Sequence, residues 1–491
     1  MRTVYALALL SHLGLGALGA SLPTASGAAD PWPAAGGPQS ISFSLATSPQ
    51  LVGHRIYVVN VSIAGSTHEV VLDTGSNDFW VDTTLGAPLA DHNPSSPGPV
   101  HAQTGIPALL EYGVENAYTY ALGEVQFASV QFPSAGGNEP IVVHNQPFVN
   151  VPGTTNITQY GNEGVLGLGP PTGLSAVREV LDGTDWKPGP FLATMFEQHP
   201  EMQRLFTLSF GRRDTAGAIT TGAVTFGAVR AEPSEILDAP KIPLMTGQFW
   251  DVPSRGFVVD GTVVNLSGSG TDELRFILDS GVYATFAPPE YLRAIYSPVP
   301  GSFLLEDGTW SVPCDTRMNV SVLLGETAYG IHPVDMTEVY GLEEEDGTWK
   351  PLCKGLFQSN PDTEIPFLIG LNVLRNLHVL HLYGGVDGHP EPYVQIATDI
   401  AQASADFSAM NTARIDAFLR AEEVTAETSS VERPMESVVN TVLRTPEIRR
   451  TMRGWYVDAL LLSSACFAVL YAICRWFRLR ARCAKYEAVR V

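Results

Sequence analysis

The chain has few basic side chains for its length. Its 491 residues include 29 Lys and Arg against 51 Asp and Glu, which gives a formal net charge of −22. A surface this acidic repels nucleic-acid phosphates, so DNA- and RNA-binding proteins are excluded. Charged residues make up only 16% of the chain and hydrophobic residues 45%. This composition is typical of a globular protein with a large core and excludes a disordered chain.

Metal-binding patterns are also absent. The sequence has five cysteines but no C-x-x-C pair and no cluster of histidines, so we expect no zinc site, no other metal and no cofactor.

Each end of the chain carries an apolar segment. Residues 1–20 have Arg2, then an apolar run, then small residues, which is typical of a secretory signal peptide; a buried N-terminal helix is the alternative. Residues 457–477 are apolar over a length that would span roughly 31 Å as a helix. Aromatic residues flank this run and a basic tail follows it. A transmembrane helix is the favoured interpretation, over a GPI signal or a core helix.

These ends predict a single-pass type I membrane protein of the secretory pathway, in the plasma membrane or a vacuole-like compartment, with a lumenal or extracellular N-terminal part. We divide the chain into a signal peptide (1–20), a short segment (21–40), two lobes (41–230 and 231–400), a stalk (401–454), a transmembrane helix (455–477) and a basic cytosolic tail (478–491).

Between residues 41 and 400 the pattern is one of short apolar strands interrupted by turn residues. Alternation and β-branched content favour strands over helices. Clear examples are residues 55–63, 69–72, 205–210 and 223–226. Helical stretches in this region are few, roughly at 191–199 and 288–295, so the fold class is all-β with few short helices. Residues 401–453 lack enough apolar periodicity for a core and are interpreted as a stalk with some helix, for instance over 412–423.

Two cysteines lie in the part expected to be lumenal. Cys314 and Cys353 can pair in an oxidising compartment. The others, Cys466, Cys474 and Cys483, lie in or beside the apolar C-terminal run. Cys474 and Cys483 are palmitoylation candidates, although unmodified thiols fit equally well. Sequons predict glycosylation of a secreted chain at Asn60, Asn156, Asn265 and Asn319.

Two segments of the β region resemble each other. Residues 70–76 read VVLDTGS and residues 276–282 read FILDSGV. In each, an apolar strand leads into an Asp, a small hydroxyl residue and a Gly. The buried strand brings Asp73 or Asp279 into the interior, while Gly75 and Gly281 permit a tight turn.

A pair of such turns can perform acid–base chemistry. The hydroxyls of Thr74 and Ser280 can bond to the backbone of the opposite loop and lock the two turns together. Two carboxyls held close cannot both ionise easily, so they share a proton. One can then take a proton from water while the other gives a proton to a peptide carbonyl. Ser76 can donate to Asp73 and keep it ionised.

With these motifs, the chain resembles the pepsin-like aspartic proteases over most of residues 50–400, in particular the membrane-anchored, fungal-type members. Residues 73–81 (DTGSNDFWV) match the first active-site motif of that family. The resemblance implies a bilobal pepsin-like fold with Asp73 and Asp279 as catalytic residues. It also implies that Trp80 supports a flap hairpin, that Tyr112 and Gly113 of this flap close over the substrate, and that Cys314 and Cys353 form a disulfide.

Two further segments carry the resemblance. Residues 164–169 (GVLGLG) are similar to the glycine segment that runs behind the first Asp, and residues 367–370 (FLIG) to its counterpart in the second lobe. The expected function is a monomeric aspartic endopeptidase acting on peptides or proteins.

The sequence also departs from the family pattern. Val282 stands where a hydroxyl residue is common, and residues 114–116 (VEN) alter the flap. Residues 21–54 contain no Lys or Arg, so a basic propeptide is not recognisable. These departures keep open an alternative, a catalytically impaired membrane-bound pseudoprotease that acts as a binding protein.

Overall fold

The structure is a computed structural model of the chain. It describes residues 39–47, 55–85, 102–113, 119–132, 140–153, 155, 162–187, 189–211, 222–229, 235–266, 273–343, 349–360, 367–384, 391–398 and 406–420.

Strands dominate the first half of the described chain. Its elements are β1 (Gln39–Thr47), β2 (Arg55–Ile63), β3 (Ser66–Asp73), β4 (Phe79–Val81), β5 (Ala102–Tyr112), β6 (Thr119–Phe132), β7 (Ile141–Asn150), β8 (Gly164–Gly167), α1 (Ala176–Leu181), α2 (Phe191–Gln198), β9 (Leu205–Ser209) and β10 (Gly222–Phe226).

The second half repeats this pattern with shorter strands. Its elements are α3 (Glu235–Asp238), β11 (Ile242–Pro243), β12 (Asp251–Ser254), β13 (Phe257–Val259), β14 (Thr262–Val264), β15 (Leu274–Leu278), β16 (Thr285–Ala287), α4 (Pro289–Tyr296), β17 (Phe303–Leu304), β18 (Trp310–Val312), β19 (Val320–Leu324), β20 (Thr327–Ile331), the 3₁₀ helix η2 (Pro333–Met336), β21 (Thr337–Glu343), β22 (Trp349–Gly355), β23 (Phe357–Ser359), β24 (Phe367–Ile369), α5 (Leu371–Leu374), β25 (His378–Leu382) and β26 (Tyr393–Ala397).

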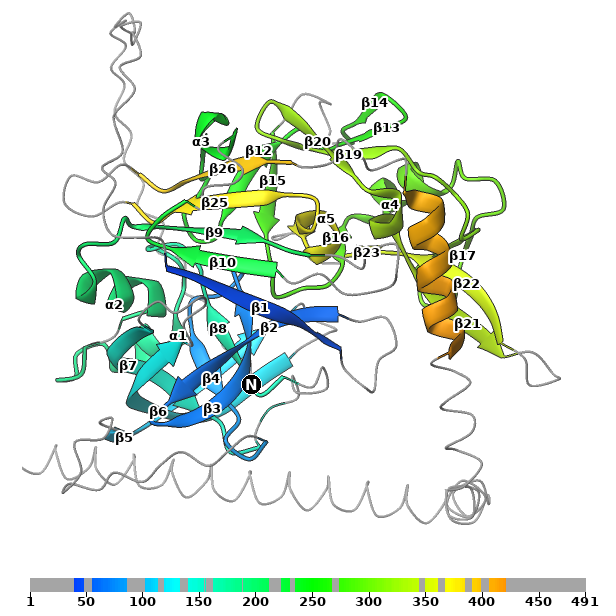
Figure 1. The fold of residues 1–491 in the computed structure, drawn as a ribbon. Coiled ribbons are helices and arrows are strands. Elements are labelled where there is room, and N and C mark those ends of the chain that lie inside the picture. The colour runs from blue at the N-terminus through cyan, green and yellow to red at the C-terminus, as the bar shows by residue number, and fades with distance from the viewer. Residues whose placement is uncertain are drawn as a thin grey trace, which may run out of the picture.

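One large sheet joins the two halves. It has 13 strands in the order β11-β26-β25-β9-β10-β1-β2-β3-β8-β4-β7-β6-β5. The junction is the antiparallel pairing of β25 from the second half with β9 from the first, and the ladder β25, β9, β10, β1 is visible in the middle of Figure 1. Three smaller sheets of five, four and four strands form the rest of the second half.

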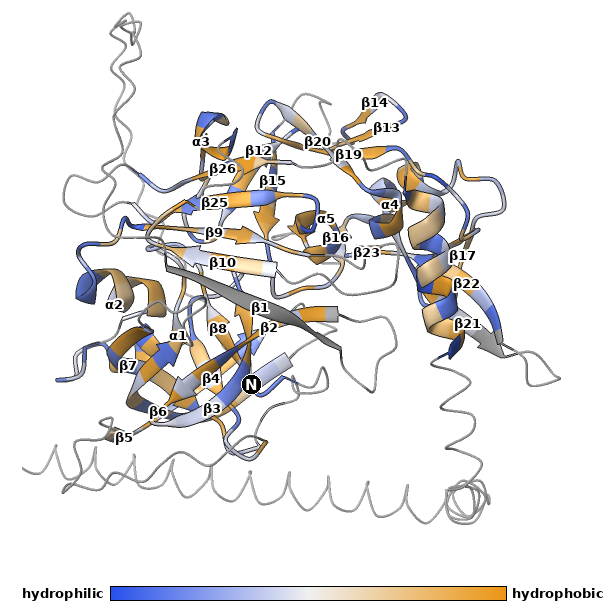
Figure 2. Ribbon diagram, viewed as in Figure 1, coloured by the Kyte–Doolittle hydropathy of each residue, from blue (hydrophilic) through white to orange (hydrophobic). Residues whose placement is uncertain are grey.

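Apolar strands bring the two Asp-containing motifs to matching places. The last four residues of β3 are buried, and β3 pairs in parallel with β8. In the second half, β15 pairs in parallel with β24, and its last three residues are buried. Strands buried on both faces are continuous apolar runs, which is why both motifs begin with three apolar residues. Figure 2 shows the same apolar colouring along the strands of the interior.

The sequence predicted the regular elements well. The strand predicted at 55–63 coincides with β2, and the strands predicted at 69–72, 205–210 and 223–226 fall on β3, β9 and β10. The two expected helices are α2 and α4, each within one residue of the expected bounds. The mostly β character with few short helices is thereby confirmed.

The expected stalk begins later than the sequence suggested. Residues 407–420 form a helix that packs against the second half, so these residues belong to the folded domain. Phe407, Met410 and Phe418 on this helix are buried. The buried guanidinium of Arg414 makes five hydrogen bonds, among them two to the carbonyls of Val334 and Thr337. Figure 1 shows the helix beside β21 and β22.

Several expected segments lie outside the described residues: the signal peptide, residues 21–38, the stalk beyond residue 420, the apolar run of 455–477 with Cys466, Cys474 and Cys483, and the basic tail. Within the part of the chain that the structure describes, no helix has both the length and the apolar character needed to cross a bilayer.

Candidate active site

The two motif aspartates stand on facing loops between the halves of the molecule. Asp73 is the last residue of β3, and Asp279 follows β15 directly. Both residues are at least nine-tenths buried, with exposed fractions of 7% and 9%. Their partner strands hold the backbones: Leu168 donates its N–H to the Asp73 carbonyl at 2.7 Å, and Asp279 donates its N–H to the Ile369 carbonyl at 3.0 Å.

Four hydrogen bonds lock the two loops together. The Thr74 hydroxyl donates to the Leu278 carbonyl at 2.8 Å and accepts from the Ser280 N–H at 2.9 Å. The Ser280 hydroxyl donates to the Leu72 carbonyl at 2.6 Å and accepts from the Thr74 N–H at 3.0 Å. Both hydroxyl residues are 1% exposed, so water does not compete for these bonds. Serine in place of threonine at 280 thus keeps the interlock.

Each carboxyl lies against the glycine of the opposite loop. A Cβ on Gly75 would be 2.5 Å from Asp279 Oδ2, and a Cβ on Gly281 would be 2.5 Å from Asp73 Oδ1 and 3.2 Å from Asp279 Oδ1. Any side chain at either position would collide with a carboxyl. The glycines are therefore needed because they let the two carboxyls approach each other.

Asp73 accepts more hydrogen bonds than Asp279. The Ser76 hydroxyl donates to Asp73 Oδ2 at 2.5 Å and the Gly75 N–H donates to Oδ1 at 2.8 Å. Burial raises the pKa of Asp73, while the bonds from Ser76 and Gly75 act in the opposite direction. These bonds stabilise the ionised form of Asp73.

Asp279 accepts a hydrogen bond from the Gly281 N–H at 2.8 Å. Burial is the largest cause that holds the pKa of Asp279 well above its usual range, and the neighbouring negative charge of Asp73 is the second. Val282, which is half-buried, offers no hydroxyl that would lower it. These surroundings favour the proton on Asp279 and the charge on Asp73.

A hairpin of the first half brings Tyr112 near Asp73. Strands β5 and β6 are paired up to Tyr112 and Thr119, and Gly113 follows with a φ of +88°. The tip with residues 114–116 lies outside the described residues. The Tyr112 hydroxyl is buried, and burial together with the charges of Asp78 and Asp73 raises its pKa well above its usual range. Tyr112 therefore reaches into the site.

Trp80 is a neighbour of Tyr112. It is fully buried in β4, and its side chain together with Ser76 faces the Tyr112 hydroxyl. The fold thus brings together four residues that the sequence singled out, Asp73, Ser76, Trp80 and Tyr112.

Two residues of the first motif have structural partners that the sequence analysis did not assign. Asp78 accepts bonds from the Ser175 hydroxyl at 2.6 Å and from the Ala176 N–H at 2.8 Å, so it fixes the start of α1 behind the site. Asn77 is buried against Gly169 and Gly173 of the segment that follows β8. Their place in the first motif is the sequence signal that could have pointed to these two residues. Their partners lie about 100 residues away, so the sequence did not show what they bind.

Other predicted residues lie apart from the dyad. Cys314 and Cys353 form the disulfide that the resemblance implied, joining β22 to the turn after β18. Of the sequons, Asn60 and Asn319 are exposed and Asn265 is half-buried, while Asn156 lies outside the described residues.

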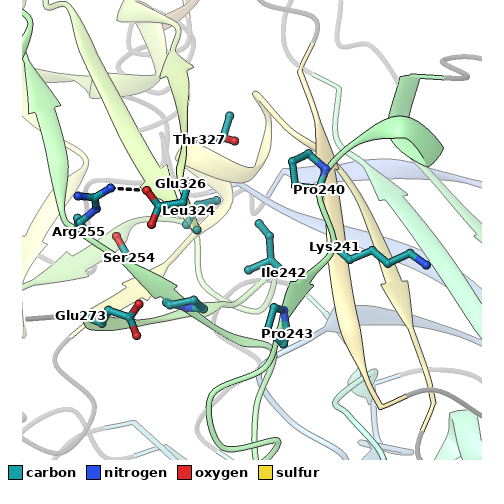
Figure 3. A pocket seen from close by; sticks show the side chains of 12 residues that line it. Pro240, Lys241, Ile242, Pro243, Ser254, Arg255, Glu273, Leu324, Glu326 and Thr327 are labelled. Carbon is teal, nitrogen blue, oxygen red and sulfur yellow. Dashed lines mark hydrogen bonds and ion pairs between the residues drawn. The ribbon is translucent and has the colours of Figure 1, made fainter. Parts of the chain in front are cut away.

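A cavity of about 240 Å³ opens on the second half, away from the two loops. Figure 3 shows that Ile242, Leu324 and proline rings form its walls and that the Arg255–Glu326 ion pair closes one side. Because none of its lining residues comes from the loops of Asp73 or Asp279, this cavity is not part of the candidate active site.

Comparison with known proteins agrees with this geometry. Residues 56–384 match the model of the eukaryotic aspartyl protease family, and the chain belongs to this family. It is 23% identical over 348 residues to major aspartyl peptidase 1 of Cryptococcus neoformans var. grubii, covering 67% of this chain and 66% of that protein. It is 22% identical over 289 residues to an aspartic protease of Phaffia rhodozyma, covering 55% of this chain and 62% of that protein. The matches thus span less than two thirds of these relatives, which are peptidases by name.

Proposed function

We propose that the chain is an active aspartic endopeptidase in which Asp73 and Asp279 form the catalytic pair. The observation that carries the proposal is the contact of each carboxyl with the glycine of the other loop, held by the interlock of Thr74 and Ser280. Family membership supports a peptidase, and the geometry supports catalytic competence.

The two carboxyls divide the work according to their surroundings. A water molecule bound between them gives a proton to the ionised Asp73 and attacks the carbonyl carbon of the peptide. The protonated Asp279 gives its proton to the carbonyl oxygen, so the tetrahedral intermediate forms without a separated charge. Tyr112 and Gly113 close over the substrate backbone, and Trp80 supports Tyr112 from below.

This division requires an acidic medium. Above the pKa of Asp279 the pair loses its general acid, and well below the pKa of Asp73 it loses its base. Because burial and the charge of Asp73 raise the pKa of Asp279, the activity should extend towards weakly acidic pH.

The test is cleavage of an unstructured protein by the purified chain between pH 3 and 7, with and without a statine-type inhibitor. The Asp279→Asn variant, which keeps the shape of the side chain, should lose activity by several orders of magnitude. Cleavage that survives in this variant, or a well-folded parent that cleaves nothing at any pH, would contradict the proposal. The second result would favour the pseudoprotease, a binding protein with the same fold.

We further propose that the peptidase acts in the secretory pathway as a single-pass type I membrane protein and as a monomer. The signal-like residues 1–20 and the apolar run of residues 457–477 support this location. A disulfide between Cys314 and Cys353 suits an oxidising compartment. Protease protection of the folded domain in sealed microsomes, with the tail accessible, tests the topology.

A further inference from the structure

A closed ring of hydrogen bonds lies beneath the two candidate catalytic residues. On the side of the first half, the Leu168 N–H donates to the carbonyl of Asp73 at 2.7 Å, and the Leu168 carbonyl accepts from the indole N–H of Trp250 at 2.8 Å. The same Leu168 therefore binds the backbone of Asp73 and the side chain of Trp250.

The ring closes through the second half. The Trp250 carbonyl accepts from the Leu278 N–H at 3.0 Å, and Leu278 is the residue before Asp279. The Leu278 carbonyl accepts from the Thr74 hydroxyl at 2.8 Å, and Thr74 is bonded to Asp73. Thr74 and Trp250 are the two residues that enter this ring through a side chain.

Trp250 is held firmly in place. Its side chain has no exposed surface, and it stands just before β12, the strand paired with β15. Its ring contacts Phe206 and His381, edge to face, at centroid distances of 5.8 and 4.8 Å. Phe206 and His381 lie on β9 and β25, the strands that join the two halves. A rigid indole in this position can hold the two halves at a fixed distance from each other.

The ring adds a constraint that the interlock alone does not provide. Thr74 and Ser280 bond to each other's backbone and to the carbonyls of Leu278 and Leu72, so the interlock holds the residues next to each aspartate. The bond from Trp250 to Leu168 joins the two halves at a point outside this interlock. A tie separated from the interlock opposes rotation of the two loops about it.

We propose that Trp250 is a positioning residue of this site, whose indole N–H fixes the spacing of the two catalytic carboxyls by tying Leu168 of the first half to the strand that leads into Asp279. The inference rests on the proposed function, because it assigns a role in the same reaction. Trp250 itself does not touch the substrate or the reacting water.

The consequence is specific to the chemical step. A misplacement of about 1 Å in reacting groups can lower the rate by about 100-fold. Without the tie, the carboxyls separate and the charge of Asp73 acts more weakly on Asp279. Among the described residues, Asp73 is the charged group that raises the pKa of Asp279, so a larger separation lowers this pKa. The high-pH limb of the activity profile then moves to lower pH, whereas substrate binding is little changed.

The experiment compares three forms of the full-length chain purified in detergent. Trp250→Phe removes the N–H donor and part of the ring. A second form carries benzothienylalanine at 250, in which sulfur replaces the N–H and the ring shape is kept. Phe206→Leu is the matched control, since it removes a similar amount of buried aromatic volume beside Trp250 without removing a hydrogen-bond donor.

In both forms altered at 250, we expect kcat to fall by about 10- to 100-fold while KM stays within about twofold of the parental value. The high-pH limb of the activity profile should shift towards acid in both. The Phe206→Leu control should lose thermal stability but keep kcat and the pH profile. Parental kcat and pH profile in the benzothienylalanine form would overturn the proposal, and so would equal changes in Phe206→Leu.

The pH dependence of binding of a statine-type inhibitor measures the same pair of carboxyls without turnover. An acid shift in the two forms altered at 250 supports the proposal even if the parent cleaves nothing, and an unchanged dependence overturns it. Failure of the proposed function, an inactive parent, is thereby distinguished from failure of this inference.

Discussion

At the scale of single residues, the site is asymmetric. Ser76, three residues after Asp73, donates to its carboxyl, but Val282 stands three residues after Asp279 and has no hydroxyl. The two loops are otherwise alike, so we expect a hydroxyl at 282 to donate to Asp279 as Ser76 donates to Asp73.

We expect Val282→Thr to lower the pKa of Asp279, because a hydroxyl that donates to a carboxylate stabilises its ionised form. Asp279 is the proton donor, so a lower pKa removes the acid at a lower pH. The high-pH limb of kcat/KM should move towards acid by about half to one pH unit. The measurement is the pH profile of peptide cleavage.

The matched control is Val282→Ala, which changes the packing at this position without adding a donor. A shift of the same size in Val282→Ala, or none in Val282→Thr, would show that the missing hydroxyl does not set the pKa of Asp279.

A second prediction concerns the close approach of the loops. Gly281→Ala places a methyl group 2.5 Å from Asp73 Oδ1, and the backbone atoms cannot yield cheaply because the interlock holds them. The variant should lose at least about 100-fold in kcat, since the carboxyls are forced apart. Gly261→Ala controls for the loss of a glycine, because no atom lies within 4 Å of a Cβ there; its φ of +81° should cost only some stability.

Local sequence was sufficient to find the dyad but not its supports. Asp73, Asp279, Thr74 and Ser280 act through groups within their two motifs, so the motifs alone predicted the interlock. Trp250 acts on Leu168, 82 residues away, and this pairing exists only after the large sheet has formed. Such long-range contacts leave no periodic pattern in the chain.

At the scale of elements, the packing of the helix of residues 407–420 was the main difference from the expectation, which had a helix at about 412–423 within a stalk. Its buried positions Phe407, Met410 and Phe418 follow helical spacing, but Arg414 stands in the middle of this stripe. A cation there suggests an exposed helix when only the sequence is considered. In the structure its donors are all occupied, so burial of the guanidinium is compensated.

We expect Arg414→Met to destabilise the domain by about 2–4 kcal/mol, because the buried carbonyls of Val334 and Thr337 lose their donors. Arg420→Met, at the exposed end of the same helix, should change stability by less than about 0.5 kcal/mol. Urea unfolding followed by tryptophan fluorescence measures both. Equal stability of the two variants would show that the helix is not anchored by Arg414.

At the scale of the whole molecule, acidity affects stability as well as catalysis. His381 lies on β25 and stacks on Phe206 with a centroid distance of 4.4 Å. Burial lowers the pKa of His381 to about 3 in the folded chain. The unfolded chain therefore binds a proton between pH of about 6.5 and 3 that the folded chain does not bind, and stability falls as the pH falls through this range.

We expect His381→Phe to reduce this loss, which amounts to at most about 1.4 kcal/mol per pH unit for one group. The measurement is the free energy of unfolding at several pH values between 3 and 7. His144→Gln, at an exposed histidine, serves as the control and should keep the parental slope. A parental slope in His381→Phe would show that another group is responsible.

The overall architecture was predictable where strands are buried on both faces, because such strands are continuous apolar runs. The joining of both halves in one sheet of 13 strands was not predicted. Pairing of β9 with β25 connects positions about 170 residues apart, and the alternation within each strand does not specify its distant partner.

The anchored helix also determines how far the site can move if residues 455–477 span a membrane as proposed. With the whole of 401–454 extended, the tether would reach roughly 180 Å, at about 3.4 Å per residue. Because the chain is fixed to the domain up to residue 420, the remaining 34 or so residues reach only roughly 115 Å. A shorter tether confines the candidate active site to a thinner layer above the bilayer and raises its local concentration around neighbouring membrane proteins.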